Sequence, residues 1–229
     1  MAQLKQCRGI YAITAPEYFS LDHAYSQACT LLQSGISILQ FRDKINDFGT
    51  CLAIGKKLKE ACQKHNALFI VNDSVELALQ LAADGVHLGQ SDDGYRQARA
   101  KLGPDAIIGI TCHDQLPLAI TAQNQGANYV AFGRAFASTS KPGGPSIEPA
   151  IIAQYQQQLN IPVVAIGGID ENNIAAFGRS QIPLLAVINA LYQNDSLSEN
   201  CHRLIQAYKN ASVFPSSTST QAKPVGVMS

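Results

Sequence analysis

The chain has 229 residues, of which 46% are hydrophobic and 15% charged, and its 17 Lys and Arg balance its 17 Asp and Glu. This length suits one α/β barrel domain, since such barrels run to about 250 residues. A balanced charge gives no sign of the clustered basic face that a nucleic-acid-binding protein needs, and no apolar run approaches the roughly 20 residues of a membrane span.

Eight short apolar runs, bounded by Gly, Pro, Asn or Asp, alternate with amphipathic stretches along the chain. Each run is apolar without a polar alternation, as are strands that are buried on both faces. The runs are Gly9–Thr14, Ile36–Phe41, Ala67–Val71, Gly85–Leu88, Ala106–Thr111, Tyr129–Gly133, Pro162–Gly167 and Leu184–Asn189. We therefore predict parallel strands at these positions.

The stretches between the runs have helical periodicity. Apolar residues recur at helical spacing in Cys51–Lys64 and in Leu197–Tyr208, and Asp170 and Ser196 stand where helix N-caps are expected. Strand-and-helix units with short links require right-handed parallel crossovers. We predict one α/β domain, a single (β/α)8 TIM barrel over residues 1–211, with a doubly wound open sheet as the alternative.

The C-terminal segment predicts where the folded domain ends, and the cysteines indicate the kind of compartment. Residues 212–229 are rich in Ser, Thr and Pro without a period, which predicts a disordered tail. The six cysteines form no C-x-x-C pair, so neither a zinc site nor a redox motif is indicated, and scattered thiols suit a reducing compartment. With no signal peptide at the N-terminus, we expect a soluble cytoplasmic protein.

Polar residues collect where the predicted strands end, which is where barrel enzymes carry their chemistry. Gln40, Arg42 and Lys44 share one face at the end of the second strand because strand side chains alternate. An Arg and a Lys that converge at the mouth of a barrel suit a phosphate. The alternative is a solvated charge cluster.

Two aspartates follow neighbouring strands. Asp73 ends the third strand and Asp92 follows the fourth, so their carboxylates would repel unless protonated or bridged by a cation. Mg²⁺ takes one or two carboxylates together with waters and phosphate oxygens. Beside Arg42 and Lys44 the pair suits a Mg-diphosphate better than an acid/base dyad. A helix N-cap at Asp92 and a turn at Asp73 are the alternatives.

A second set of anion-binding groups is predicted on the other half of the mouth. The loop Phe136–Pro145 carries hydroxyls, Lys141 and glycines, although such loops are also common without a function. Gly167-Gly168 and Ile188-Asn189 end the last two strands, where barrel phosphate sites form. Elsewhere, His87 suits a hydrogen-bonded core position better than a base, and Cys112 lacks a partner base.

These residues occur in a succession of motifs that resembles the thiamine-phosphate synthase family over about residues 8–208. The motifs are Q-x-R-x-K (Gln40 to Lys44), V-N-D (Val71 to Asp73), D-G-V-H-L-G-Q-x-D (Asp84 to Asp92), G-I-T (Gly109 to Thr111), F-G-R-x-F-x-S-x-S-K-P (Phe132 to Pro142), V-A-I-G-G-I (Val164 to Ile169) and A-V-I-N (Ala186 to Asn189). That family is a (β/α)8 barrel that joins a pyrimidinylmethyl diphosphate to a thiazole phosphate and releases pyrophosphate.

The resemblance implies a role for each matched residue. Asp73 and Asp92 would bind Mg²⁺, and Arg42, Lys44 and Lys141 would be catalytic, since cations stabilise the charge of a departing diphosphate. The pyrimidine diphosphate would be bound by Gln40, Phe41, Arg42, Asp43, Lys44, Asn72, Thr111 and Lys141. The thiazole phosphate would be bound by Ser138, Thr139, Ser140, Gly168, Ile188 and Asn189. The family's reaction passes through a pyrimidinylmethyl cation, for which no protein nucleophile is needed.

Two other functions use a similar barrel. A thiazole tautomerase-like relative would not need the aspartate pair or the full Q-x-R-x-K set, and a non-catalytic protein that binds thiamine precursors could dispense with both aspartates. The presence of Asp73, Asp92 and the whole basic strand end favours the synthase. We expect small phosphorylated molecules as partners, no nucleic acid and no membrane, and the sequence leaves a homo-oligomer open.

Overall fold

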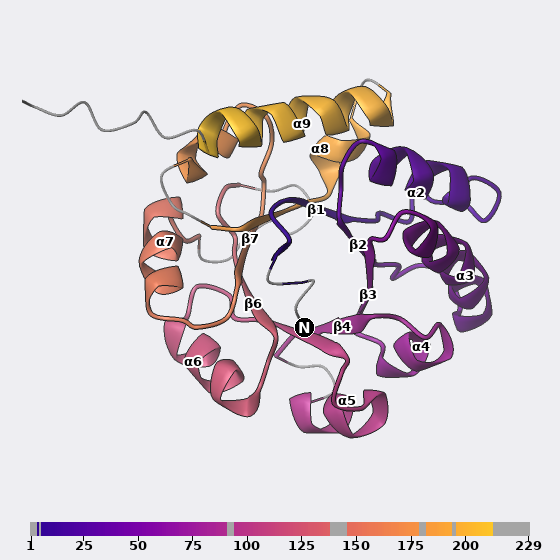
Figure 1. Ribbon diagram of the computed structural model, residues 1–229, viewed down its shortest axis with the longest axis horizontal. Coiled ribbons are helices and arrows are strands. Elements are labelled where there is room, and N and C mark those ends of the chain that lie inside the picture. Colours follow the sequence, from indigo (N-terminus) through magenta and orange to yellow (C-terminus); the bar gives the residue numbers. More distant parts are fainter. Residues whose placement is uncertain are drawn as a thin grey trace, which may run out of the picture.

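The computed structural model describes residues 4, 6–90, 94–137, 146–178, 182–193 and 196–212. Within them, parallel strands β1 to β8 pair in chain order, and β8 pairs with β1 to close a barrel. Helices surround the barrel (Figure 1). The predicted (β/α)8 barrel is confirmed, and the doubly wound open sheet is wrong because β1 and β8 are hydrogen-bonded partners.

Each predicted run forms a strand, with ends that differ by at most two residues. The strands are β1 (Gly9–Ile13), β2 (Ile38–Phe41), β3 (Leu68–Asn72), β4 (Gly85–Leu88), β5 (Ile107–Thr111), β6 (Tyr129–Phe132), β7 (Val163–Ile166) and β8 (Leu184–Val187). The helices are α2 (Ala24–Gln33), α3 (Phe48–Lys64), α4 (Val75–Gln80), α5 (Tyr95–Leu102), α6 (Leu116–Gln125), α7 (Pro149–Gln157), the 3-10 helix η1 (Ile174–Phe177), α8 (Asn189–Tyr192) and α9 (Leu197–Ser212).

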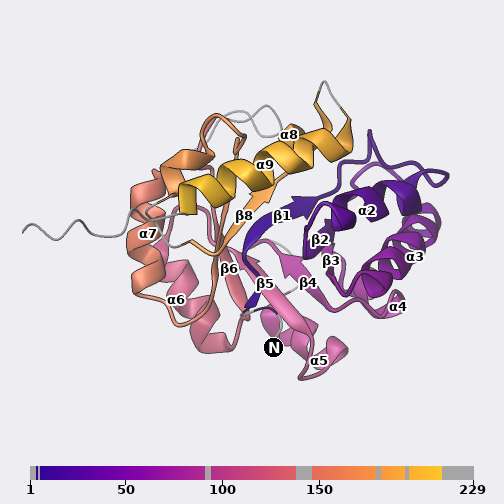
Figure 2. The same ribbon diagram turned by 45° about the horizontal axis from the view of Figure 1, so that its top comes forward.

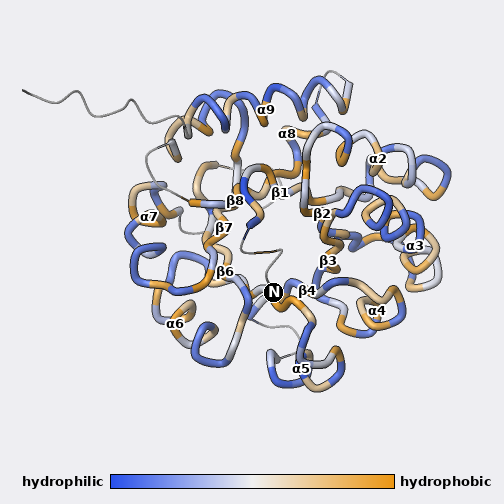
Figure 3. The backbone as a smooth tube through the Cα atoms, viewed as in Figure 1, coloured by the Kyte–Doolittle hydropathy of each residue, from blue (hydrophilic) through white to orange (hydrophobic). Residues whose placement is uncertain are grey.

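The strands are apolar on both faces because each face packs into a separate layer. One cluster fills the barrel interior and the other fills the space between the strands and the helices. The interior cluster consists of Leu4, Cys7, Tyr11, Ile13, Ile38, Leu68, Ile70, Ile107, Tyr129, Ala131, Val164, Leu184 and Ala186. Hydrophilic and hydrophobic residues alternate along α3 and α9 (Figure 3).

The helix ends follow local capping chemistry. Helix α3 begins three residues earlier than predicted because Asp47 accepts a hydrogen bond from the Thr50 backbone N–H at 3.0 Å. Ser196 caps α9 as predicted, with its Oγ 3.3 Å from the backbone nitrogen of Glu199. Helix α9 packs next to β1 and α2 on the outside of the barrel (Figure 2).

Asp170 does not begin a full helix. Its carboxylate accepts hydrogen bonds from the backbone of Asn172 and Asn173, but only η1 follows. Helix α9 takes the adjacent space, since a Cβ on Gly178 would overlap the Ala211 carbonyl. A longer helix after β7 would need the space that α9 occupies. The outer side of this part of the barrel is covered by α9 instead.

Helix α9 is the last element of the described part of the chain. Helix α9 ends at Ser212, and the rest of the predicted tail, residues 213–229, lies outside the described residues. In the described ranges, no helix is long and apolar enough to span a bilayer. The cytoplasmic location stays a prediction.

Candidate active site at the carboxyl ends of the strands

The end of β2 presents Arg42 on a fixed backbone. The Thr14 hydroxyl donates to the Arg42 carbonyl at 3.0 Å and accepts from the Arg42 backbone N–H at 2.8 Å. Thr14 itself is fully buried. These two bonds join the end of β1 to the end of β2, so the backbone from which the Arg42 side chain leaves is held at the mouth of the barrel.

Lys44 and Asp73 form an ion pair at the mouth. The Lys44 Nζ lies 2.7 Å from an Asp73 carboxylate oxygen, with the side chains 57% and 29% exposed. An ion pair this exposed contributes at most about 1 kcal/mol, so either group can exchange its partner for a ligand at small cost. The structure thus joins two predicted site residues from neighbouring strand ends.

The backbone of Asp73 has a left-handed conformation and a hydrogen bond to the neighbouring strand. Its φ of 64° lies in the left-handed region, which Asp tolerates better than most residues. Its N–H donates to the His87 carbonyl at 2.8 Å, which links the end of β3 to β4. The backbone of Asp73 is therefore held against β4.

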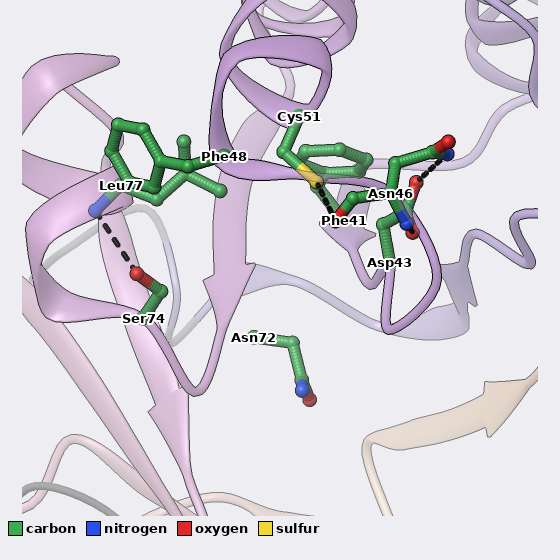
Figure 4. Close-up of a pocket in the computed structure, with 8 residues that line it drawn as sticks. All are labelled: Phe41, Asp43, Asn46, Phe48, Cys51, Asn72, Ser74 and Leu77. Atoms are coloured by element: carbon green, nitrogen blue, oxygen red, sulfur yellow. Dashed lines mark hydrogen bonds between the residues drawn. The ribbon is translucent and has the colours of Figure 1, made fainter.

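Two further predicted residues of the β2 end have structural partners. The Asp43 carboxylate accepts hydrogen bonds from the backbone N–H groups of Ile45 and Asn46 and from the Asn46 amide (Figure 4). Burial raises the pKa of Asp43, but these bonds and the Arg42 charge outweigh it and hold the pKa below its usual value. The Asp43 side chain closes its own loop, and its contact with a ligand stays a prediction.

Phe41 faces away from the barrel interior. It is 2% exposed and stacks on Phe69 with ring centroids 6.5 Å apart, in the layer beneath the helices. This follows from strand alternation, because the preceding residue, Gln40, faces inward. The Phe41 side chain thus lies outside the barrel interior, and its contact with a ligand stays a prediction.

A small pocket of about 190 Å³ lies beside the mouth (Figure 4). It is lined by Phe41, Asp43, Asn46, Phe48, Cys51, Asn72, Ser74 and Leu77. Typical small-molecule pockets measure about 300–1,000 Å³, so this one is too small to hold two phosphorylated ligands. Asn72 links it to the mouth, since Asn72 ends β3 one residue before Asp73.

The end of β5 carries Thr111, which is tied to the barrel interior. His87 Nε2 lies 2.8 Å from the Thr111 hydroxyl, and His87 Nδ1 lies 2.9 Å from the Tyr129 hydroxyl. His87 is 9% exposed, so the predicted core position with hydrogen-bonding partners is confirmed. Gln90 donates to the Thr111 carbonyl at 2.6 Å, a contact that the sequence did not suggest.

The opposite half of the mouth contains the glycines that end β7. Gly167 and Gly168 have φ values of 109° and 61°, and a Cβ on Gly167 would lie 2.8 Å from the Arg134 Cα. Only glycine allows the loops after β6 and β7 to approach this closely. Ile188 packs against the interior cluster and Asn189 begins α8, so both lie at the same end of the barrel as Gly168.

Several predicted residues lie outside the described residues: Asp92, Ser138, Thr139, Ser140 and Lys141. In the described part of the chain, no group of three or more His, Cys, Asp or Glu side chains lies close enough together to hold a metal ion. A Mg²⁺ site of the predicted kind uses one or two carboxylates, so it does not require such a group.

Cys112 has the properties of an inert core thiol. It is fully buried and hydrogen-bonded to the Ile110 carbonyl, and burial raises the pKa of its thiol to about 12. At pH 8 nearly all of this thiol is therefore protonated, and the thiol form is a poor nucleophile. In the native protein we expect iodoacetamide to label Cys112 far more slowly than the partly exposed Cys29, as measured by mass spectrometry of timed samples. Equal rates would contradict this assignment.

Comparisons with known proteins show which family the chain is similar to. The sequence profile of the thiamine monophosphate synthase family matches residues 10–191. The chain is 40% identical over 205 residues to the thiamine-phosphate synthase of Thioalkalivibrio sulfidiphilus (90% of this chain, 97% of the relative). It is 42% identical over 206 residues to that of Saccharophagus degradans (88% and 94%).

A solved structure is similar over nearly the whole chain. The thiamine phosphate pyrophosphorylase from Pyrococcus furiosus superposes with a TM-score of 0.80 at 27% identity, covering 93% of this chain and 100% of that one. The family profile and the curated relatives span most of the barrel, including the ends of β2, β3 and β5. The chain belongs to the thiamine monophosphate synthase family.

Proposed function

We propose that the chain joins (4-amino-2-methyl-5-pyrimidinyl)methyl diphosphate to the phosphate ester of the thiazole, or to its carboxylated form, and releases pyrophosphate and thiamine phosphate. Membership of the family makes the chain a transferase of thiamine biosynthesis. The observation that carries the proposal is the meeting of Lys44 with Asp73 at the mouth, next to the fixed backbone of Arg42.

The basic residues would act on the leaving group. As the bond between the methylene carbon and the diphosphate oxygen breaks, negative charge builds on the diphosphate. Arg42 and Lys44 would stabilise that charge, because cations held at the place where charge develops lower the energy of the transition state. Lys141, which follows β6 in the sequence, would add a third cation. The pyrimidine would be held by Gln40, Asn72 and Thr111.

The Asp73 carboxylate after β3 is a donor that suits Mg²⁺. The Asp73 carboxylate already holds a cation, the Lys44 ammonium, at 2.7 Å and remains partly exposed. Together with Asp92 it would supply the one or two carboxylates that Mg²⁺ uses. When bound, the metal would neutralise diphosphate charge, and Lys44 would then be released from Asp73 to contact the diphosphate.

The thiazole phosphate would bind across the mouth. Gly168, Ile188 and Asn189 lie at that end of the barrel, and the predicted partners Ser138, Thr139 and Ser140 come just before Lys141 in the sequence that follows β6. Backbone N–H and hydroxyl groups are suitable donors to a phosphate. This arrangement would present the thiazole nitrogen to the pyrimidinylmethyl carbon.

One assay tests the proposed function against its alternatives. Purified protein, both phosphorylated substrates and Mg²⁺ are incubated, and thiamine phosphate is measured by fluorescence after oxidation. We expect product only when both substrates and native protein are present. A thiazole tautomerase-like barrel, or a protein that only binds thiamine precursors, would give no more product than a heat-killed control, and that result would reject the proposal.

A further inference from the structure

A continuous chain of hydrogen bonds crosses the barrel interior beneath the mouth, from Gln40 on β2 to Thr111 on β5. It runs from Gln40 Nε2 to the Tyr11 hydroxyl (2.9 Å), to the Tyr129 hydroxyl (2.9 Å), to His87 Nδ1 (2.9 Å), and from His87 Nε2 to the Thr111 hydroxyl (2.8 Å). Five strands contribute one residue each. Both ends of this interior chain are predicted to bind the pyrimidine diphosphate, whereas its three middle residues have no assigned role.

The geometry of the interior chain depends on Gly109. In the sheet, Gly109 of β5 is paired with His87 of β4 on one side and with Tyr129 of β6 on the other. Because glycine has no Cβ, the two rings stack across β5, with centroids 5.5 Å apart and planes 19° from parallel. A Cβ on Gly109 would overlap the Tyr129 ring.

The middle residues are shielded from water, so each of their polar hydrogens must be donated to an acceptor within the protein. Tyr11 and Tyr129 are each 1% exposed, and their rings meet edge to face at 6.1 Å. Burial raises the pKa of Tyr11 to about 12, which keeps its hydroxyl protonated. Each tyrosine therefore has one hydrogen to donate, and counting these hydrogens gives the interior chain a direction.

The count starts from Gln40, whose Nε2 can only donate. Tyr11 accepts that hydrogen and must give its own to Tyr129, since otherwise a buried donor would be left without an acceptor. Tyr129 then donates to His87 Nδ1, which must be unprotonated. The ring hydrogen is consequently on Nε2 and is donated to the Thr111 hydroxyl oxygen.

We propose that Tyr11, Tyr129 and His87 are positioning residues that fix the orientation and donor state of Gln40 and Thr111. In this state the Gln40 amide presents its oxygen as an acceptor, and the Thr111 hydroxyl hydrogen is available for an acceptor on the ligand. The claim that this ligand is the pyrimidine diphosphate rests on the proposed function, but the direction of the hydrogen bonds does not.

The direction can be read without any substrate. In protein labelled with ¹⁵N-histidine, the nitrogen shifts and two-bond couplings distinguish the two neutral ring tautomers, and the His87→Asn variant identifies the His87 signals among the five histidines. We expect the neutral form with hydrogen on Nε2. A ring protonated on Nδ1, or a doubly protonated ring, would overturn the proposed direction.

The positioning role is tested by kinetics. Tyr129→Phe removes the central hydroxyl and keeps the ring, and we expect it to raise the KM for the pyrimidine diphosphate about 10-fold, as for a lost hydrogen bond, while the KM for the thiazole phosphate stays unchanged. Tyr208→Phe is the matched control, because its hydroxyl donates to the Pro183 carbonyl outside the interior chain. In a Thr111→Val background, the effect of Tyr129→Phe should fall to under about twofold.

Equal changes in both KM values, or full additivity with Thr111→Val, would show that Tyr129 only supports the fold and would overturn the positioning role. If the wild-type protein made no thiamine phosphate, the proposed function would fail, but the His87 tautomer would still report on the interior chain. The two failures are therefore distinguishable.

Discussion

Replacing Asp73 by Asn is expected to lower kcat about 100-fold or more and to raise the Mg²⁺ concentration needed for half-maximal rate. The substitution removes the negative charge that now pairs with Lys44 at 2.7 Å and that is proposed to hold Mg²⁺ beside the diphosphate. A loss of this size corresponds to about 3 kcal/mol of transition-state stabilisation, which is typical for one lost electrostatic contact in a site. Steady-state kinetics over a series of Mg²⁺ concentrations measures both effects.

Asn is the better replacement at this position because the backbone φ is 64°. Asn populates the left-handed region readily, whereas Ala would add backbone strain to the loss of charge. Asp84→Asn is the matched control, since Asp84 also pairs with a lysine, Lys59 at 3.0 Å, but lies before β4, at the other end of the barrel. An Asp73→Asn protein with wild-type kcat at low Mg²⁺ would show that Asp73 is not a metal ligand.

Replacing Gly109 by Ala is expected to lower the free energy of unfolding by about 2–3 kcal/mol, at the upper end of the range for overpacked cores. The new Cβ would occupy the position of the Tyr129 ring. That ring cannot swing aside freely, because it is buried between the rings of Tyr11 and His87 and bonded to both. Denaturant titration followed by circular dichroism gives the change in stability.

Gly94→Ala is the control for this substitution. Gly94 is the N-cap of α5, and among the described residues no atom other than those of Gly94 and its chain neighbours lies within 4 Å of the position that its Cβ would take. We expect it to change stability by less than about 1 kcal/mol. If Gly109→Ala were as mild as Gly94→Ala, the close packing of Tyr129 over β5 would be wrong.

The fold could be predicted from the sequence because its signals are local. Runs such as Gly85–Leu88 are apolar on both faces and end at glycine or polar residues, which identifies a strand buried between two layers. Short links between such runs leave few topologies. The start of α3 was also encoded locally, in Asp47 and Thr50, but the apolar periodicity alone pointed to a later start.

The site was only partly predictable. Because barrel enzymes carry their sites at the carboxyl ends of the strands, the sequence predicted Lys44 and Asp73 at the same end of the barrel. The structure adds the ion pair between them. A position at the end of a strand does not determine which partners a side chain contacts. Asp43 bonds to its own loop, and Phe41 faces the helices because it alternates with Gln40.

The interior chain of hydrogen bonds could not be predicted from the sequence. Tyr11 and Tyr129 are separated by 118 positions, and each reads as an ordinary strand residue. A glycine within a strand usually weakens it, so the sequence gives no reason for Gly109. Its role becomes clear only from its neighbours in the sheet, His87 and Tyr129, whose rings stack across it. Such contacts depend on strand register around the closed barrel, which local patterns do not specify.

The central claim is that this mouth assists the departure of a diphosphate with Mg²⁺. The most direct measurement follows pyrophosphate and thiamine phosphate in the same reaction, first with excess EDTA and then after Mg²⁺ is restored. The account predicts that both products form in a one-to-one ratio with Mg²⁺ and that neither forms with EDTA. Thiamine phosphate made at an undiminished rate in EDTA, or without an equal amount of pyrophosphate, would contradict it.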